Sequence, residues 1–464
     1  MPHLFALLLP LMIVQLGIGL PFFGGGKDKA AEYEQEHTAW VYPPWEHTWG
    51  VVRATETHLD VFTLGKATFR NPQGLAAVRL TATDDPDSKG DDDEVTVYGI
   101  NSGENAIIYN RSMRSIGLFG YDDETRDFLD EPWDIAALPN GLVFVTDSGH
   151  RRVVKFRNVD GELVFQSEFG RDGQGALVLP RGIDVTVGGL VVVADAGADR
   201  VVLYDTSGVF VKAIGGFDRP VGLAAVDSLD IHTRPKRNYF AVTDSGGQRL
   251  RRVDFDGHIL AEKDISLIQG ERDTYAGHIE IDLYHNIAAT DSTNDRLLKF
   301  DENLELLSVW GQTGEGRTRF HSPTGIAIWR RFGQAFVAES RGAHYLWVGT
   351  DISTPPRLAF PGPGQIRVGL DLTERSQITL EIVDDDGKVL RTRNSYRDPG
   401  SRSVLWRYDR ATFVRPEPEG RVQIERPGTL PEGEYTLRIR LRATYSSRKA
   451  FERVMETSVQ LSGN

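Results

Sequence analysis

Residues 143–156 read VFVTDSGHRRVVKF, and they contain the pattern that the rest of the chain repeats. An apolar run, a short polar turn and a second run that alternates apolar and polar residues predict two antiparallel strands. Asp147, Ser148 and Gly149 form the predicted turn, because short polar side chains hydrogen-bond the local backbone and glycine accepts unusual dihedral angles. The stretch therefore predicts a tight β-hairpin.

The same hairpin pattern occurs at regular intervals along the chain. Its turns are centred on Asn101, Asp147, Asp195, Asp244, Asp291 and Glu339, which are 46, 48, 49, 47 and 48 residues apart. A near-constant period of this length indicates a repeat architecture, and it leaves room for four strands in each unit. We therefore expect an all-β chain with a six-bladed β-propeller over residues 50–354.

A second motif lies upstream of each turn. It reads Pro72-Gln-Gly-Leu, Pro132-Trp-Asp-Ile, Pro180-Arg-Gly-Ile, Pro220-Val-Gly-Leu, Ala276-Gly-His-Ile and Pro323-Thr-Gly-Ile. Followed by V-x-D-x-x-x-x-R, this P-x-G-[IL] motif resembles the NHL repeat over about residues 50–350, which also implies a propeller. Four units carry an aspartate and, five residues later, an arginine, and we expect these pairs to cap turns and form ion pairs within a blade. The pairs are Asp147/Arg152, Asp195/Arg200, Asp244/Arg249 and Asp291/Arg296.

Residues 58–65, HLDVFTLG, match the pattern of residues 162–170, ELVFQSEFG, which are expected to contain the outermost strand of the second unit. An outer strand that precedes the first inner strand in sequence can pair with the last blade, and this pairing would close the ring of blades. Residues 58–65 would complete the sixth blade and remove an exposed sheet edge.

Composition excludes several classes of protein. A net charge of −13 argues against a nucleic-acid-binding surface, which needs concentrated positive charge, although some members of the NHL family bind RNA. The absence of cysteine excludes disulfides, thiol catalysis and cysteine-zinc sites.

The N-terminal segment predicts export. Residues 4–23, LFALLLPLMIVQLGIGLPFF, carry no charge. Residues 1–26 would be a signal peptide, although no basic residue precedes the apolar run, or an uncleaved anchor, because 20 apolar residues can span a membrane. Residues 27–49 are expected to be a linker. We expect a secreted, periplasmic or cell-envelope protein that meets a membrane only through this segment, if it is retained.

In four of the six units, glycine precedes the Ile or Leu of the P-x-G-[IL] motif, whereas the other two units have Asp134 and His278 at that position. Because these two units are three apart, we expect the two side chains to face each other across the propeller axis. Arg181 and Glu280 lie nearby in sequence. Histidine and carboxylates can hold a metal or act as acid and base. Related propellers include metal-dependent lactonases and lyases. The alternative is a polar channel lining with water, and it is favoured because a metal site usually needs three or more converging ligands.

The acidic loop, residues 84–94, contains seven acidic residues and one lysine. Clustered oxygens suit calcium, but the loop lacks the EF-hand spacing and such charge runs are usually solvated. Both interpretations stay open.

After a Pro/Gly-rich linker at residues 355–364, the periodicity changes. Short alternating strands over residues 365–464 predict an antiparallel β-sandwich. The order of Val383 to Lys388, Trp406 and Pro431-Glu-Gly-Glu-Tyr435 resembles the Ig-like domain of the flagellar hook-capping protein.

Fold alone does not fix an activity. We expect a monomeric, non-enzymatic binding or scaffolding protein that needs no cofactor and takes a protein or carbohydrate ligand. The alternative is a metal-dependent lyase or hydrolase with its site at the channel mouth.

Overall fold

A computed structural model describes residues 37–43, 52–84, 95–112, 115–269, 272–409, 412–414, 423–425, 430–445 and 451–461. The predicted signal peptide or anchor at residues 1–26 and residues 85–94 of the acidic loop lie outside these ranges. Among the described residues, no helix is long and apolar enough to cross a membrane. Residues from His37 onward form one compact unit.

Most of the described chain belongs to six antiparallel sheets that follow one another in sequence. The first sheet contains β3 (Pro72–Arg79), β4 (Val95–Asn101), β5 (Ala106–Ser112) and β6 (Ser115–Phe119). The second contains β7 (Pro132–Ala137), β8 (Leu142–Asp147), β9 (Arg152–Val159) and β10 (Glu162–Phe169). The third contains β11 (Pro180–Val185), β12 (Leu190–Asp195), β13 (Arg200–Asp205) and β14 (Phe210–Gly215).

The remaining three sheets repeat this order. The fourth sheet contains β15 (Leu223–Val226), β16 (Tyr239–Asp244), β17 (Arg249–Val253) and β18 (Ile259–Asp264). The fifth contains β19 (Ala276–Ile281), β20 (Ile287–Asp291), β21 (Arg296–Phe300) and β22 (Leu306–Trp310). The sixth contains β25 (Pro323–Trp329), β26 (Gln334–Glu339) and β27 (Gly342–Val348), and it is completed by β1 (Trp40–Val41) and β2 (Arg53–Thr55). Between the last two sheets, β23 (Gln312–Thr313) and β24 (Arg319–Phe320) form a short parallel pair.

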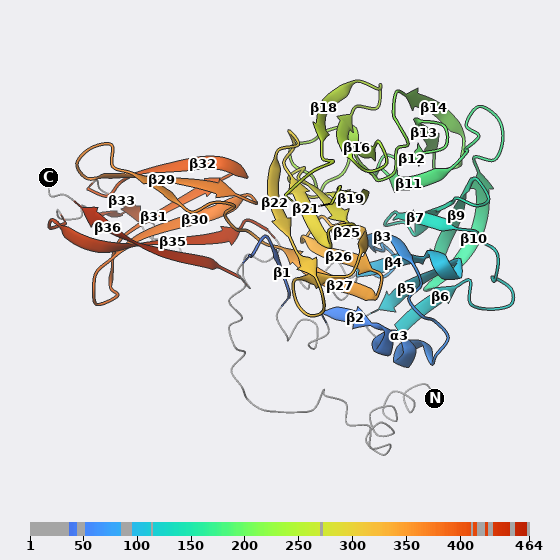
Figure 1. The fold of residues 1–464 in the computed structure, drawn as a ribbon, viewed down its shortest axis with the longest axis horizontal. Helices are drawn as coiled ribbons and strands as arrows, with labels where there is room; N and C mark the ends of the chain where they lie inside the picture. The colour runs from blue at the N-terminus through green and yellow to red at the C-terminus, as the bar shows by residue number, and fades with distance from the viewer. Residues whose placement is uncertain are drawn as a thin grey trace, which may run out of the picture. The chain divides into compact units, whose positions relative to one another are not determined.

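The first strands of successive sheets contact one another in a cyclic order. β3 contacts β7, and the contacts continue through β11, β15, β19 and β25 back to β3. Figure 1 shows these strands around one centre, with β6, β10, β14 and β18 at the periphery. The apolar core lies between neighbouring sheets, where the alternating side chains of second and third strands are buried, for example Val143, Val145, Val154 and Phe156.

The four Asp/Arg pairs are confirmed as ion pairs within single sheets. Nε of the arginine lies 2.6, 3.2, 2.6 and 2.8 Å from the carboxylate in the pairs at Asp147, Asp195, Asp244 and Asp291. All four aspartates are fully buried. Three of them also cap backbone N–H groups of the segment before their sheet: Asp147 accepts from Asp130 at 2.7 Å, Asp195 from Leu179 at 2.9 Å and Asp291 from Tyr275 at 3.2 Å.

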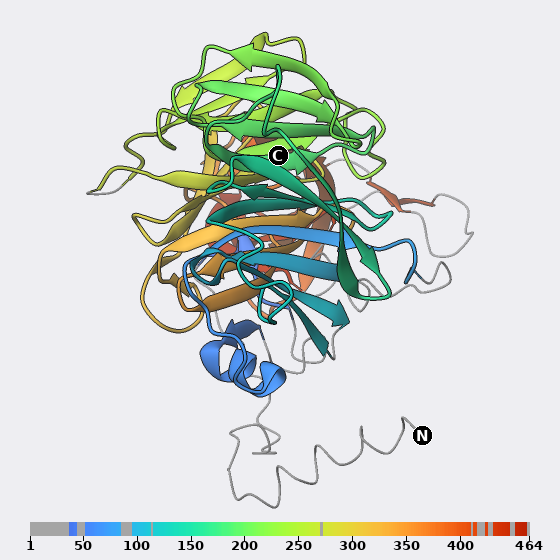
Figure 2. The ribbon, with the colours of Figure 1, turned by 90° about the vertical axis from the view of Figure 1, so that its right-hand side faces the viewer.

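The expected outer strand at residues 58–65 is wrong, because residues 56–63 form helix α3 (Glu56–Thr63). His58 Nδ1 accepts a hydrogen bond from the Thr55 N–H at 3.2 Å, which satisfies the start of the helix, and Leu64 ends it with a φ of 55°. Leu59 and Thr63, one turn apart, are the buried positions. The alternation that suggested a strand is therefore a helical face. Figures 1 and 2 both show α3 beside β2 and β6 at the periphery.

Ring closure by the N-terminal segment nevertheless holds, through residues upstream of the expected ones. Trp40 pairs with Val348, and Arg53 pairs with His344, so β1 and β2 share the open edge of β27. β1 lies within the segment that the sequence predicts as a linker, residues 27–49. Its Trp40 side chain is fully buried.

The sixth sheet also takes a charged group from the N-terminal segment. The residue five positions after Glu339 is His344 rather than arginine, and Arg53 of β2 supplies the guanidinium, with Nε 2.9 Å from Glu339 Oε1. His344 Nε2 lies 3.2 Å from the same oxygen, and the His321 N–H donates to Oε2 at 2.7 Å. Although burial acts to raise it, these donors hold the pKa of Glu339 below its ordinary value.

The C-terminal residues form two further antiparallel sheets with a shared core. One contains β28 (Arg357–Ala359), β29 (Gln365–Leu372) and β32 (Gly400–Arg407). The other contains β31 (Val389–Arg397), β30 (Ser376–Val383), β35 (Gly433–Ala443) and β36 (Arg453–Leu461), and a separate hairpin pairs β33 (Thr412–Val414) with β34 (Gln423–Glu425). Buried side chains of both sheets pack together, among them Val368, Leu380, Trp406 and Ile439. Because β28 lies inside the predicted linker at residues 355–364, this part of the chain begins earlier than expected.

A buried ion pair joins the fifth sheet to the C-terminal residues. Lys155 and Arg252, at matching positions of their third strands, donate to carbonyl oxygens of the next sheet, those of Thr206 (2.8 Å) and Glu302. Lys299 occupies the same position in β21, but its ammonium group bonds to Glu374 and lies 3.5 Å from Asp282 Oδ2. All three side chains are no more than 1% exposed. The turn after β29 therefore provides the hydrogen-bond acceptor for Lys299, whereas the next sheet provides the acceptor for Lys155 and Arg252.

Substitution of Arg53 by methionine should lower the stability of the folded chain strongly, because it removes the cation beside a buried carboxylate. We expect a loss of about 3 kcal/mol in the free energy of unfolding, measured by chemical denaturation. Arg70→Met is the matched control, since Arg70 is 67% exposed and pairs with Glu104 at the surface, and it should cost less than about 1 kcal/mol. Equal losses for the two variants would contradict the role assigned to Arg53.

Candidate functional site

Two side chains from opposite sheets meet at the axis, near the start of the first strands. The Trp133 ring of β7 stacks on the His278 ring of β19, with centroids 5.6 Å apart and an angle of 15° between the planes. The Arg181 guanidinium carbon lies 4.1 Å from the centre of the Trp133 ring. The sequence predicts that His278 faces Asp134, but the second-sheet residue that its ring contacts is Trp133, one position before Asp134.

His278 is buried, at 4% exposure, and its Nε2 has no hydrogen-bond partner among the described residues. Burial, with a smaller effect of Arg181, lowers the pKa of His278 to about 4. The imidazole is therefore neutral at pH 7. Its other contact is a hydrogen bond to the Trp133 backbone.

Asp134 joins neighbouring sheets through backbone hydrogen bonds. Its Oδ1 accepts from the Ile135 N–H at 2.9 Å, and its Oδ2 accepts from the Ile183 N–H of β11 at 3.1 Å. The carboxylate also fills the space beside Gly74 of β3, where an added Cβ would lie 1.9 Å from Oδ1. Burial raises the pKa of Asp134 well above its ordinary value. Within the described ranges, no hydrogen bond or ion pair joins Asp134 to His278.

A second cluster, which we call the Arg330 cluster, lies at the C-terminal ends of first strands and in the segments that follow them. It consists of Arg330, Glu280, Asp230 and Asp184. Nitrogen atoms of the Arg330 guanidinium lie 2.8 Å from Glu280, 3.1 Å from Asp230 and 3.9 Å from Asp184, and Nε donates to the Ile281 carbonyl at 2.7 Å. Three carboxylates from three sheets thus converge on one cation.

The protonation of the Arg330 cluster is strongly perturbed. Burial raises the pKa of Glu280 to about 7, against the opposing effect of Arg330, and it raises the pKa of Asp184 as well. Although burial opposes it, the carboxylates raise the pKa of Arg330 above its ordinary range. The side chains of Asp184, Glu280 and Arg330 keep 21%, 18% and 19% exposure, so water still reaches them.

The repeat contained a signal for part of this cluster. Asp184 and Glu280 occupy the same position in the first strands of their units, two residues after the third residue of the P-x-G-[IL] motif. The other four units have alanine at this position: Ala76, Ala136, Ala224 and Ala327. Sequence reasoning named Glu280 and missed its equivalence to Asp184. Arg330 and Asp230 lie in irregular segments that follow first strands, outside the repeated motif, so the pattern gave no reason to place them together.

Within the described ranges, no group of three or more His, Cys, Asp or Glu side chains is placed to hold a metal ion. Asp84, the one described residue of the acidic loop, pairs with Arg79 of β3. The calcium hypothesis otherwise concerns residues outside the described ranges.

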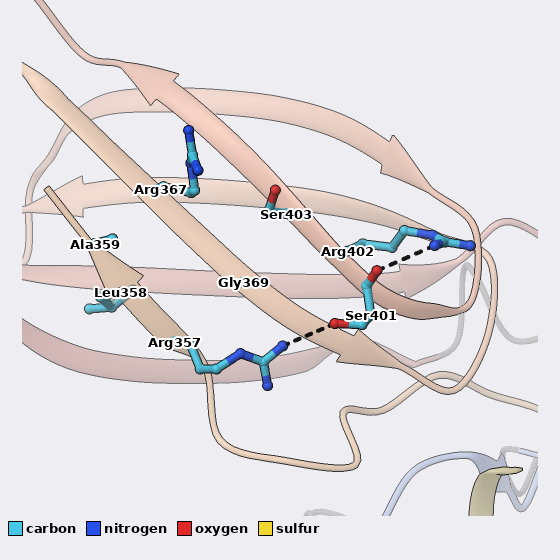
Figure 3. A pocket seen from close by; sticks show the side chains of 8 residues that line it. All are labelled: Arg357, Leu358, Ala359, Arg367, Gly369, Ser401, Arg402 and Ser403. Atoms are coloured by element: carbon cyan, nitrogen blue, oxygen red, sulfur yellow. Dashed lines mark hydrogen bonds between the residues drawn. The ribbon is translucent and has the colours of Figure 1, made fainter. Parts of the chain in front are cut away.

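Two open hollows lie away from the axis. One, of about 400 Å³, lies where β2 meets the sixth sheet and is lined by Arg53, Thr55, Glu56, Thr57, Glu315, Ser340 and Arg341. The second, of about 330 Å³, lies on β28, β29 and β32, and Figure 3 shows its lining side chains.

Comparison with known proteins agrees with the repeat. The model of the NHL repeat family matches residues 129–156, which contain β7, β8 and most of β9. Together with six successive sheets of one topology, this match supports a β-propeller of the NHL type. No curated protein matches the chain.

Solved structures are similar at low identity. Virginiamycin B lyase from Staphylococcus aureus is 13% identical, over 63% of this chain and 94% of that chain, with a TM-score of 0.37. XC5397, a gluconolactonase from Xanthomonas campestris, is 14% identical, over 64% and 94%, with a TM-score of 0.43. A chain of a nidogen/laminin complex is 18% identical, over 59% and 87%, with a TM-score of 0.39. At this level none of them carries an activity or a partner over to this chain.

The titration of Glu280 should make stability depend on pH. Its pKa is about 7 in the folded chain against about 4.3 when unfolded, so its contribution is fully present below about pH 4.3 and is lost as the pH rises toward 7. The difference in unfolding free energy between the native chain and Glu280→Gln should therefore fall across this window, by an amount on the order of 1 kcal/mol. A difference that is flat or that rises with pH would contradict the assignment.

Proposed function

We propose that the chain is a six-bladed NHL-type β-propeller followed by an Ig-like sandwich, and that it acts outside the cytoplasm as a non-enzymatic, protein-binding platform. The cyclic contacts of six first strands support the blade number. The shared core of the two C-terminal sheets supports the sandwich. The uncharged run at residues 4–23 supports export, by cleavage or as an anchor.

The observation that carries this proposal is that the axis is filled by side chains that bind one another. Trp133, His278 and Arg181 form a stack at one level, and Arg330 engages three carboxylates at another. Both oxygens of Asp134 already accept backbone hydrogen bonds. A hydrolase or lyase would need such groups to converge on a space that a substrate can enter.

The segment that follows β15 offers a surface for a partner. Leu229 and Ile231 are 63% and 74% exposed, and Val187 in the neighbouring turn is 52% exposed. The two segments touch, since the Gly188 N–H donates to Asp227 Oδ2 at 2.6 Å. Exposed branched side chains beside a charged cluster are typical of a protein-binding surface, with an apolar centre and a polar rim.

Binding through this surface can be tested with residues 27–464 immobilised and exposed to the cell-surface proteins of the source organism. A retained protein is then purified and its affinity is measured directly. Leu229→Glu combined with Ile231→Glu should weaken its binding about 10-fold or more, because charge enters the apolar centre. Val389→Glu, at a position 41% exposed on β31, is the matched control and should leave binding unchanged. Equal effects of both changes would overturn this placement.

The alternative function, a metal-dependent lyase or hydrolase, rests on the unpaired Nε2 of His278. Elemental analysis of residues 27–464, purified without chelators, distinguishes a metal-dependent enzyme from a non-enzymatic binding protein. We expect less than about one metal ion in ten molecules, and the same content in His278→Ala. A stoichiometric metal that is lost from His278→Ala would favour the enzyme and overturn the proposal.

A further inference from the structure

The hollow on β28, β29 and β32 exists because one position of a β-strand has no side chain. The register places Arg357, Gly369 and Ser403 in one row across the outer face, next to a row that contains Arg367. A Cβ on Gly369 would lie 3.5 Å from Arg357 Cβ, an ordinary contact, and its φ is not positive. The backbone therefore does not require glycine there, and the space beside it is available to a ligand.

Positive charge exceeds negative charge around this hollow. Arg367, Arg397 and Arg402 have no carboxylate partner in the described part of the chain. Arg397 Nε donates to the Ser403 carbonyl at 3.1 Å, and Arg402 donates to the Ser401 carbonyl at 3.3 Å, a bond drawn in Figure 3.

The nearby acids are already neutralised by other arginines. Asp371 takes two bonds from Arg357, one of them at 2.8 Å, and these bonds hold its pKa far below the ordinary range. Asp398 is bonded to Arg375 at 3.0 Å. Three guanidinium groups thus remain uncompensated on a chain with a net charge of −13, and a guanidinium fork matches the geometry of a carboxylate.

The other lining groups indicate what carries the carboxylates. Ser401 and Ser403 are exposed. The Ser401 hydroxyl accepts from Arg357 at 3.2 Å and donates to Asp371, so Ser403 is the hydroxyl that can bond to a ligand. The lining contains no aromatic ring on which a nucleic-acid base could stack, and no exposed large apolar side chain to enter a bilayer. Hydroxyls beside guanidinium groups suit a polymer that has both hydroxyls and carboxylates.

We infer that this face of the C-terminal sheets binds an acidic polysaccharide. Arg367 and Arg402 pair with carboxylates of its sugars, and Ser403 bonds to a sugar hydroxyl. The inference does not depend on the proposed role of the propeller, because it concerns different strands and a different ligand.

Calorimetry with residues 27–464 tests the inference, with oligogalacturonate as the probe and its fully methyl-esterified form as the uncharged control. The ester should bind at least about 10-fold more weakly, because it keeps the hydroxyls and loses the charge. Arg367→Gln combined with Arg402→Gln should weaken oligogalacturonate binding to the same degree. The matched control is Arg272→Gln combined with Arg331→Gln, two exposed arginines elsewhere that also lack a described carboxylate partner, and it should bind like the native chain.

Gly369→Val provides a second variant that keeps every charge and fills the hollow. It should weaken binding about 10-fold and leave the thermal unfolding midpoint nearly unchanged, since valine suits a strand and its Cβ meets only ordinary contacts. Three results would overturn the inference: equal binding of the ester, undiminished binding by both variants, or equally tight binding of poly-glutamate, which has carboxylates without sugar hydroxyls.

Discussion

In five of the six sheets a buried carboxylate at the end of the second strand needs a cation, and the ring of sheets depends on how that need is met. In four sheets the third strand supplies arginine five residues later. In the sixth sheet the third strand supplies only His344, and Arg53 arrives from the opposite end of the repeat region. An ion pair that is internal elsewhere thus becomes the connection between the first and last parts of the ring, and β1 and β2 cover the strand edge that would otherwise be exposed.

The axis shows a second constraint, which is crowding. Four first strands have glycine where neighbouring backbones approach closely; an added Cβ at Gly182, for instance, would lie 2.4 Å from the Val221 carbonyl oxygen. In the second sheet the side chain of Asp134 enters this space and uses its oxygens as hydrogen-bond acceptors for backbone N–H groups. The axial side chains therefore belong largely to the packing between sheets.

The sequence predicted the periodic part of this structure and failed where the chain leaves the repeat. The hairpin turns, the Asp/Arg pairs and the all-β class follow from a pattern that recurs in phase, so each copy supports the others. Helix α3 has no second copy, and alternation over eight residues could not separate a strand from a short helix capped by Thr55 and His58. At the axis, the repeat placed His278 opposite the second sheet, but it could not tell whether Trp133 or Asp134 would reach it, because that choice depends on side-chain size and direction.

Trp40 and its partner in the sixth sheet, Val348, lie far apart in sequence, and this separation also sets the order in which the sheets can form during synthesis. Each of the first five sheets consists of consecutive strands, so it can pair as soon as its own residues leave the ribosome. The sixth sheet is assembled from the two ends of the ring region, and its N-terminal strands must wait while almost 300 residues are synthesised. Until then the segment made first has no edge to join. The ring of sheets can therefore close only after β27 has been made, and β1 and β2, the first of its strands to be synthesised, are the last of them to pair.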